Sequence, residues 1–351
     1  MRKTIVFSLI AGISLIMTAC AEPPAAITNQ QTPAATPTEQ IKVCLVNDAS
    51  GASLADGLAT AQTQLGVTTE SAQIAGDDDY ATAIQGLVDS GCRMVIGRGE
   101  KIAEPLAAAA KQNPEVTFVL VDARPAGSAP NLRTVVFNVH EASFLAGYTA
   151  ASQSTTKTVG TFGALDIASV TIYMDGFAQG VNYWNEQHAD QKVSLVGWDL
   201  DKHTGVFVQS AKSAFNDPDA GQAAAQKLVD QQADVIMPVA GESGVGALKL
   251  HETDPQLQFI WTQEDGCATQ SSYCSSIVTS VVKDGNAAVI ELIKAEQAGN
   301  ASGVFSANLR NGGVHLTKLA SSANSISKEL DEISEQIKQG TIKVTSASAV
   351  G

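Results

Sequence analysis

Basic residues, aromatic rings and histidines are all scarce in this chain of 351 residues. Lysine and arginine total 22 against 36 aspartates and glutamates, so the formal net charge is −14. A surface with this balance repels phosphate backbones, and we therefore expect no nucleic-acid partner. The five histidines are scattered through the sequence and no pair has the spacing of metal ligands, so no metal site is expected.

Long apolar runs and catalytic motifs are also missing beyond the N-terminus. A membrane-spanning helix needs about 20 consecutive apolar residues, and no later stretch of the sequence approaches that length. No serine, cysteine or carboxylate stands in a pattern typical of an activated nucleophile and its base. We therefore expect neither an enzyme nor a bound cofactor. An apolar fraction of 44% with only 5% aromatic residues is typical of a globular α/β protein.

The first twenty residues have the layout of an export signal. Arg2 and Lys3 precede a short apolar stretch over residues 5–17, and small residues then lead to Cys20. This order predicts a secretory signal rather than a membrane span. The cysteine after small residues resembles the lipobox of bacterial lipoproteins, which implies that Cys20 is lipidated; plain cleavage near residues 19–21 is the alternative. We expect a lipid anchor at the extracytoplasmic face of the cell membrane.

The segment that follows the signal is poor in large apolar groups. Residues 1–19 form the predicted signal peptide, and residues 20–40 form a lipidated tether rich in proline and threonine. Such a composition cannot bury a core, so this part is predicted to connect the anchor to the folded protein.

Four cysteines follow the tether in what we expect to be an oxidising compartment. Cys267 and Cys274 bracket a short polar segment, where a disulfide would close a loop, and we predict that bridge. A zinc pair is the competing interpretation, but no histidine lies nearby to complete four ligands. Cys44 and Cys92 both stand beside apolar runs and are compatible with buried thiols or with a second bridge.

From Ile41 onward, short apolar runs alternate with longer stretches in which apolar residues recur at helical spacing. This alternation predicts parallel sheets covered by helices on both faces. About 330 residues remain after removal of the signal, more than one core holds comfortably, and the alternation occurs in two series. We therefore expect two similarly wound lobes.

Four segments together resemble the BMP-type substrate-binding lipoproteins of ABC transporters, a group that includes purine-nucleoside-binding proteins. These segments are AGESGVG at 240–246, VTSVVKDGNAAV at 278–289, EASFLAGYTAA at 141–151 and NLRNGGVHL at 308–316. The resemblance implies an α/β type I periplasmic-binding fold with two Rossmann-like lobes, parallel sheets, three hinge crossovers and a ligand cleft. Crossovers are expected near residues 137–140, 262–266 and 300–305, with an N-terminal lobe of 41–138 plus 266–301 and a C-terminal lobe of 139–262 plus 305–345.

The resemblance also implies a set of ligand-binding residues. Lys283 corresponds to the family lysine that contacts ribose hydroxyls, and Phe215 matches an aromatic residue of the family cleft. Gly241 follows a strand and would let backbone approach a ligand closely. Asp122 ends a predicted strand and is a plausible acceptor for a base or sugar, although a turn role fits it as well.

Two positions depart from the family pattern. Leu54 stands where an aromatic residue would stack on a purine, and Thr262 stands where a ribose-binding aspartate is expected. Asp48 could supply a carboxylate instead, and Trp261 a stacking face, although an apolar strand equally favours a core role for the tryptophan.

The resulting hypothesis is a monomeric, lipid-anchored solute-binding protein. It would capture a small polar ligand, a nucleoside or a similar ring with hydroxyl groups, and deliver it to an ABC permease in the same membrane. The alternative is a ligand-sensing or adhesion lipoprotein that keeps the fold but has no transport role.

Overall fold

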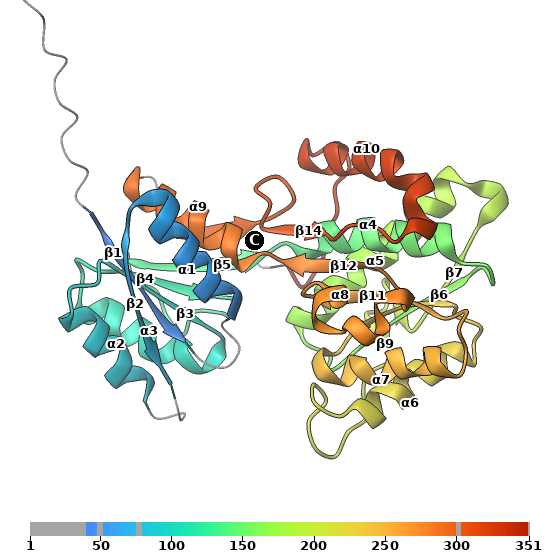
Figure 1. Cartoon of the computed structure of the whole chain (residues 1–351), viewed down its shortest axis with the longest axis horizontal. Coiled ribbons are helices and arrows are strands. Elements are labelled where there is room, and N and C mark those ends of the chain that lie inside the picture. The colour runs from blue at the N-terminus through green and yellow to red at the C-terminus, as the bar shows by residue number, and fades with distance from the viewer. Residues whose placement is uncertain (1–39, 48–51, 75–78, 300–302, 350–351) are drawn as a thin grey trace, which may run out of the picture. The chain divides into compact units, whose positions relative to one another are not determined.

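The computed structural model describes residues 40–47, 52–74, 79–299 and 303–349, which form two six-stranded sheets, a short hairpin and the helices that cover them (Figure 1). The predicted signal, Cys20 and the tether up to residue 39 lie outside the described residues, as does Asp48. Within the described part of the chain, no helix is both long and apolar enough to span a membrane.

The first sheet is entirely parallel. Its strands lie in the order β13 (Val304–Ala307), β5 (Leu132–Phe137), β4 (Thr117–Val121), β3 (Met94–Arg98), β1 (Lys42–Asn47) and β2 (Thr68–Gln73). The order of the first five strands along the chain, 2-1-3-4-5, is that of doubly wound folds, in which ligands bind beyond the carboxyl ends of the strands.

The second sheet repeats this topology with one antiparallel strand, β14, at its edge. Its order is β14 (Val314–Leu316), β12 (Ile277–Lys283), β11 (Gln258–Gln263), β10 (Val235–Val239), β6 (Thr158–Gly163) and β7 (Ser194–Val196). A separate antiparallel hairpin pairs β8 (Trp198–Asp199) with β9 (Thr204–Gly205). The two parallel-sheet lobes expected from the sequence are confirmed.

The helices divide between the two sheets. Those of the first lobe are α1 (Ala52–Leu65), α2 (Tyr80–Asp89), α3 (Glu100–Gln112) and α9 (Gly285–Gln297). Those of the second lobe are α4 (Val139–Gln153), α5 (Ala168–Gln187), α6 (Pro218–Val229), α7 (Val245–Leu248), α8 (Gly266–Thr269) and α10 (Ser327–Lys338). Short 3₁₀ helices cover Ala189–Gln191, Gly241–Gly244, Lys249–Glu252, Ser271–Ser276 and Ser321–Ile326.

Each sheet is buried on both faces, because its side chains alternate between two apolar layers. In β1, Val43 and Leu45 join the core beneath α1 and α9, whereas Cys44 and Val46 join the core beneath α2 and α3. In the second sheet, one face packs on α4 and α5 and the other on α6 and α7. This double burial explains why central strands such as β3, β4 and β10 read as continuous apolar runs.

Two of the three crossings between lobes lie further along the chain than expected. Residues 277–283 form β12, which pairs with β11 and β14 in the second sheet, so the second crossing occurs where α9 begins at Gly285 and not near 262–266. The pairing of β12 with β11 and β14 explains the difference, because the buried valines Val278 and Val281 would suit the core of either lobe. β13 then pairs with β5 in the first sheet, which places the third crossing between residues 307 and 314.

Two disulfides are present among the described residues. Cys267 is bonded to Cys274, as the spacing predicted, and the bridge closes the loop between α8 and the following 3₁₀ helix. Cys44 is bonded to Cys92, with 6.0 Å between their Cα atoms. Of the two possibilities left open by the sequence, buried thiols or a second bridge, the structure has the bridge. Both of its cysteines are buried: Cys44 lies within β1, and Cys92 lies just before the neighbouring strand β3.

The contact between α4 and α5 depends on glycine. A Cβ added at Gly180 would lie 1.9 Å from the carbonyl oxygen of Phe144, and one added at Gly147 would lie 2.0 Å from that of Phe177. Both carbonyl oxygens belong to helix backbones, so neither could make room for a Cβ unless its helix shifted.

We therefore predict that Gly180→Ala lowers the free energy of unfolding by about 1–3 kcal/mol through overpacking. Gly86 of α2 offers a matched control, because it is exposed and no heavy atom lies within 4 Å of its Cβ position. Gly86→Ala should stabilise the protein by roughly 0.5–1 kcal/mol through helix propensity. Urea unfolding measures both, and a Gly180→Ala protein as stable as the wild type would contradict the close helix contact.

Candidate functional site

Four strands from the two sheets end close together. In the first lobe, β3 ends at Arg98, β4 is followed at once by Asp122, and β5 ends at Phe137. In the second lobe, β12 ends at Lys283. All four residues stand at or just after the carboxyl ends of strands, the edge at which doubly wound sheets bind ligands.

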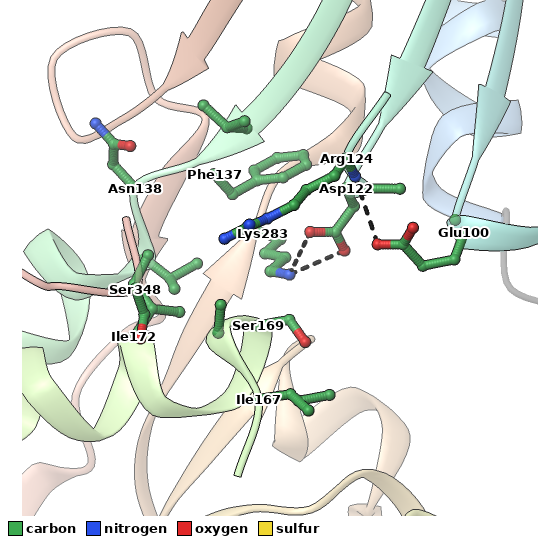
Figure 2. Close-up of a pocket in the computed structure, with 15 residues that line it drawn as sticks. Glu100, Asp122, Arg124, Phe137, Asn138, Ile167, Ser169, Ile172, Lys283 and Ser348 are labelled. Carbon is green, nitrogen blue, oxygen red and sulfur yellow. Dashed lines mark hydrogen bonds and ion pairs between the residues drawn. The ribbon is translucent and has the colours of Figure 1, made fainter. Parts of the chain in front are cut away.

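An ion pair joins the two lobes at this point. The Nζ atom of Lys283 donates to both carboxylate oxygens of Asp122, at 2.8 and 2.9 Å (Figure 2). Arg98 reaches the same carboxylate at 3.2 Å. Asp122 has a left-handed backbone conformation with φ of 60°, which aspartate tolerates better than most residues. One carboxylate is thus held between two cations from different sheets.

The electrostatics of this cluster favour the charged carboxylate. Burial alone raises the pKa of Asp122, but the charges of Lys283 and Arg98 and their hydrogen bonds outweigh it, so the pKa of Asp122 is lowered from its usual value. Asp122 is therefore an ionised acceptor at neutral pH.

Two aromatic rings flank the ammonium group. The Nζ atom of Lys283 lies 5.6 Å from the centre of the Phe137 ring and 5.7 Å from that of Tyr173, both within cation–π range. The Tyr173 hydroxyl is buried and has no hydrogen-bond partner among the described residues. Burial, together with the charge of Asp122 and against the opposing effect of Arg98, raises the pKa of Tyr173 well above its usual value.

Two cavities meet at Phe137 and Lys283, which line both. The first has a volume of about 640 Å³ and the second about 570 Å³, within the range of small-molecule sites. Figure 2 shows the first cavity with Asp122, Arg124 and Phe137 on one side and Ile167, Ser169, Ile172 and Ser348 on the other. The second is lined by residues that include Leu54, Asp56, Arg98, Gln263, Glu264, Asp265, Asp284 and His315.

The structure brings together three of the residues singled out from the sequence. Asp122 and Lys283 form the ion pair, and Leu54, buried near the start of α1, lines the second cavity.

The other four described candidates lie in the second lobe and line neither cavity. Gly241 has a φ of 55°, in the left-handed region, and a Cβ added there would lie 3.2 Å from the carbonyl oxygen of Phe215. Trp261 is buried in the core beneath α6 and α7. Thr262 is also buried, and its hydroxyl donates to the carbonyl of Pro238 on the neighbouring strand at 3.0 Å.

Sequence reasoning missed Arg98, Phe137 and the C-terminal Ser348. Arg98 and Phe137 were detectable in principle, because Arg98 directly follows an apolar run and Phe137 closes one. Ser348 had no comparable signal, since it belongs to an irregular segment whose course depends on tertiary contacts. Among the described residues, no group of three or more histidines, cysteines or carboxylates is placed to hold a metal ion.

The fold is that of ABC solute-binding proteins of the periplasmic-binding type. A solute-binding protein of an ABC transporter from Aeropyrum pernix K1 superposes with a TM-score of 0.64 at 21% identity, over 86% of this chain and 92% of that one. A transcriptional activator of the comK gene from Bacillus halodurans gives a TM-score of 0.69, also at 21% identity, over 86% and 98% of the two chains. At this identity the likeness concerns the fold alone.

The sequence profile of the PnrA-like substrate-binding proteins of ABC transporters matches residues 44–348, and the chain belongs to this Bmp family. Basic membrane protein A2 of Borrelia garinii subsp. bavariensis is 28% identical over 59% of this chain and 56% of its own length. The match thus spans just over half of that relative. The ABC transporter nucleoside-binding protein BmpA of Lactococcus lactis subsp. cremoris is 25% identical over 76% of this chain and 75% of its own length.

The ion pair generates a prediction about stability. Asp122→Asn keeps the shape and the tolerance for left-handed backbone but removes the charge, so it should lower the free energy of unfolding by about 1–3 kcal/mol at pH 7. Because the folded-state pKa of Asp122 is lowered, the wild type keeps this contribution above the unfolded value near 3.9 and loses it as the pH falls through the folded value. The difference between the proteins should therefore shrink between about pH 5 and pH 2.

Urea unfolding across this pH range measures the effect. Asp331→Asn, at an exposed position of α10, is the control and should follow the wild type at every pH. A deficit of Asp122→Asn that is independent of pH would show that the lost stability does not come from the charge of Asp122.

Proposed function

We propose that this protein is a lipid-anchored extracytoplasmic receptor that captures a nucleoside, or a similar ring with hydroxyl groups, and delivers it to an ABC permease. The observation that carries the proposal is the Asp122–Lys283 ion pair, which joins the strand ends of both lobes between two cavities and beside the Phe137 ring. The family to which the chain belongs is one of substrate-binding proteins rather than enzymes.

The chemistry of the pair suits a hydroxylated ligand. A carboxylate accepts hydrogen bonds from vicinal hydroxyls, and an ammonium donates to their oxygens, both as charge-assisted bonds. Phe137 offers an aromatic surface next to these groups, against which a flat ring can pack. Asp122, Lys283 and Phe137 are therefore the residues that we assign to ligand binding, with Leu54 and Arg98 lining the second cavity.

The charges around the cavities favour an uncharged ligand. In the first cavity Glu100 and Asp122 balance Arg124 and Lys283. In the second, four carboxylates face two cations, Arg98 and Lys283. A phosphate group would meet like charge there, which opposes binding of nucleotides.

The remaining parts of the proposal rest on the sequence and on relatives. The Lactococcus relative is named a nucleoside-binding protein of an ABC transporter, which supports the ligand class and the permease. The signal-like residues that end at Cys20 support a lipid anchor, and the Pro/Thr-rich segment supports a tether to the membrane.

A ligand screen tests the proposal. Ligand-free protein, prepared by unfolding, dialysis and refolding, should be stabilised by nucleosides in a thermal-shift assay but not by nucleoside monophosphates, ribose or arabinose. A ligand at one hundred times its Kd adds about 2.7 kcal/mol to the stability of the folded state. If none of the nucleosides raises the Tm of folded, ligand-free protein, the nucleoside assignment is wrong and the sensing or adhesion alternative gains.

Calorimetry on two variants locates the site. Lys283→Ala should weaken nucleoside binding at least tenfold, or about 1.4 kcal/mol, because the ligand loses its charged donor. Lys328→Ala, at an exposed position of α10, should bind as the wild type does. Equal affinities for the wild type and Lys283→Ala would remove Lys283 from the site.

A further inference from the structure

The C-terminal residues 341–349 run in an irregular path against the second lobe and turn at residues 347–348, and we refer to residues 345–348 as the strap. Before the strap, Ile342 and Val344 pack against the core that α4 and α5 share with the sheets. Every second residue of this segment is partly buried, and Ser346 and Ser348 occupy the next two of these positions after Val344. They carry hydroxyls where Ile342 and Val344 carry apolar groups. The side chains thus change from apolar to polar as the chain approaches the first cavity.

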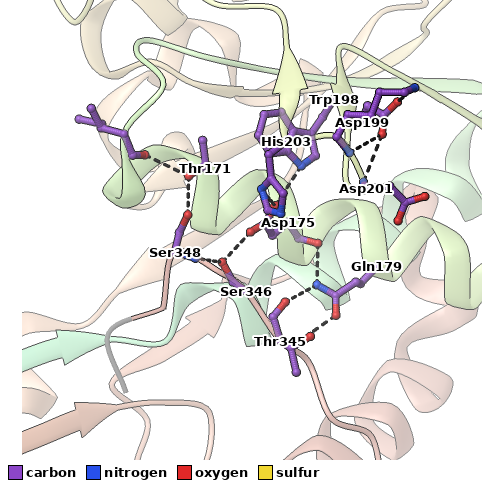
Figure 3. A network of polar contacts seen from close by, with 12 residues as sticks. Thr171, Asp175, Gln179, Trp198, Asp199, Asp201, His203, Thr345, Ser346 and Ser348 are labelled. Carbon is purple, nitrogen blue, oxygen red and sulfur yellow. Dashed lines mark hydrogen bonds and ion pairs between the residues drawn. The ribbon is translucent and has the colours of Figure 1, made fainter.

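Side chains of α5 hold the strap at two points (Figure 3). The Gln179 amide donates to the carbonyl of Thr345 at 2.6 Å and accepts from its backbone N–H at 3.1 Å. The hydroxyl of Ser346 donates to Oδ2 of Asp175 at 2.6 Å. The two bonds of Gln179 satisfy both backbone polar groups of Thr345, as pairing with a strand would. The Ser346 bond holds the next residue of the strap against the buried Asp175.

Asp175 also ties the strap to the β8–β9 hairpin. Its side chain is fully buried, and its second oxygen accepts from the indole N–H of Trp198 at 3.0 Å. A buried carboxyl group that loses a donor is left partly unsatisfied, at a substantial free-energy cost. The contact with Ser346 is therefore a built part of the lobe rather than an incidental surface contact.

The last residue of the strap reaches the first cavity. The hydroxyl of Ser348 shares a hydrogen bond of 2.7 Å with that of Thr171, and Ser348 lines the cavity beside Ser169 and Ile172 of α5. Its backbone N–H donates to the Ser346 hydroxyl at 3.0 Å, so the group that binds Asp175 also orients Ser348.

We propose that the strap is a fixed wall of the ligand cavity and that Ser348 contacts the ligand through its hydroxyl. Ser346 is a positioning residue that acts through Asp175. This inference rests on the proposed function, because it assumes that the first cavity takes the ligand. The Thr171 hydroxyl donates to the carbonyl of Ile167 at 3.2 Å, so the Ser348 hydroxyl donates to Thr171 and keeps its lone pairs for a ligand. It therefore selects ligands that present a hydrogen-bond donor over those with an apolar edge.

Affinity for the best-binding nucleoside, among adenosine, guanosine, inosine, uridine and cytidine, tests the contact. Ser348→Ala should weaken binding about threefold to tenfold, the usual effect of one lost hydrogen bond. Ser346→Ala should weaken it to a similar extent, and Ser346→Thr, which keeps the hydroxyl, should restore it. Ser325→Ala, at an exposed position outside the strap, is the control. If Ser348→Ala binds as tightly as the wild type, the proposed contact is wrong.

Hydrogen exchange tests the strap without any ligand. In the wild type the amides of Thr345, Ser348 and Ala349, which all donate hydrogen bonds, should be protected. Ser346→Ala should raise exchange at Ser348 at least tenfold, whereas Ser348→Ala should leave Thr345 protected. Exchange at the rate of an unstructured peptide in the wild type would overturn the proposal. A protected strap in a protein that binds no nucleoside would overturn the proposed function and leave the strap supported as a built wall.

Discussion

The ion pair between Asp122 and Lys283 is the interaction around which the site is organised, because its two members belong to different sheets. Taking such charges out of water costs several kcal/mol for each ion, and their attraction roughly offsets that cost, whereas loss of one partner is strongly unfavourable. The intact pair therefore adds little to the net free energy of unfolding, but each of its two charges needs a partner of opposite charge or a hydrogen bond. A ligand that supplies hydroxyls to both members can share the pair without leaving either charge unpaired.

The position of this pair follows from a topology that occurs twice. Both sheets have the doubly wound order, so both direct the carboxyl ends of their strands to an edge where irregular backbone and free side chains collect. The crossing after β12 connects the two: Lys283 is the last residue of a strand in the second sheet, and Asp284 caps the helix α9 of the first lobe through the Ala287 N–H. One residue of the site thus lies directly at a passage between lobes.

Much of this arrangement could be predicted from the sequence, since apolar runs and helical spacing are local signals. The lobes, the Cys267–Cys274 bridge and the strand-end position of Asp122 all followed from such patterns, whereas Lys283 was singled out only by its resemblance to the family lysine. The second crossing did not, because Val278 and Val281 suit the core of either lobe, and only strand pairing decides between them. Trp261 and Thr262 were ambiguous for a related reason. Successive side chains of a strand point to opposite faces of the sheet, and the sequence of a strand buried on both faces does not show which face each side chain takes. The path of the strap depends on Gln179 and Asp175, more than 160 residues away, and has no local signal.

The two lobes share a topology but contribute different chemistry to the first cavity. The first lobe supplies the carboxylate of Asp122 and the ring of Phe137, and the second supplies the ammonium of Lys283 and the hydroxyls of Ser169 and Ser348. The ammonium and the two hydroxyls come only from the second lobe, and the ring comes only from the first. A ligand that contacts both halves gains most when both are in place, and it therefore shifts the population toward that arrangement by its differential affinity.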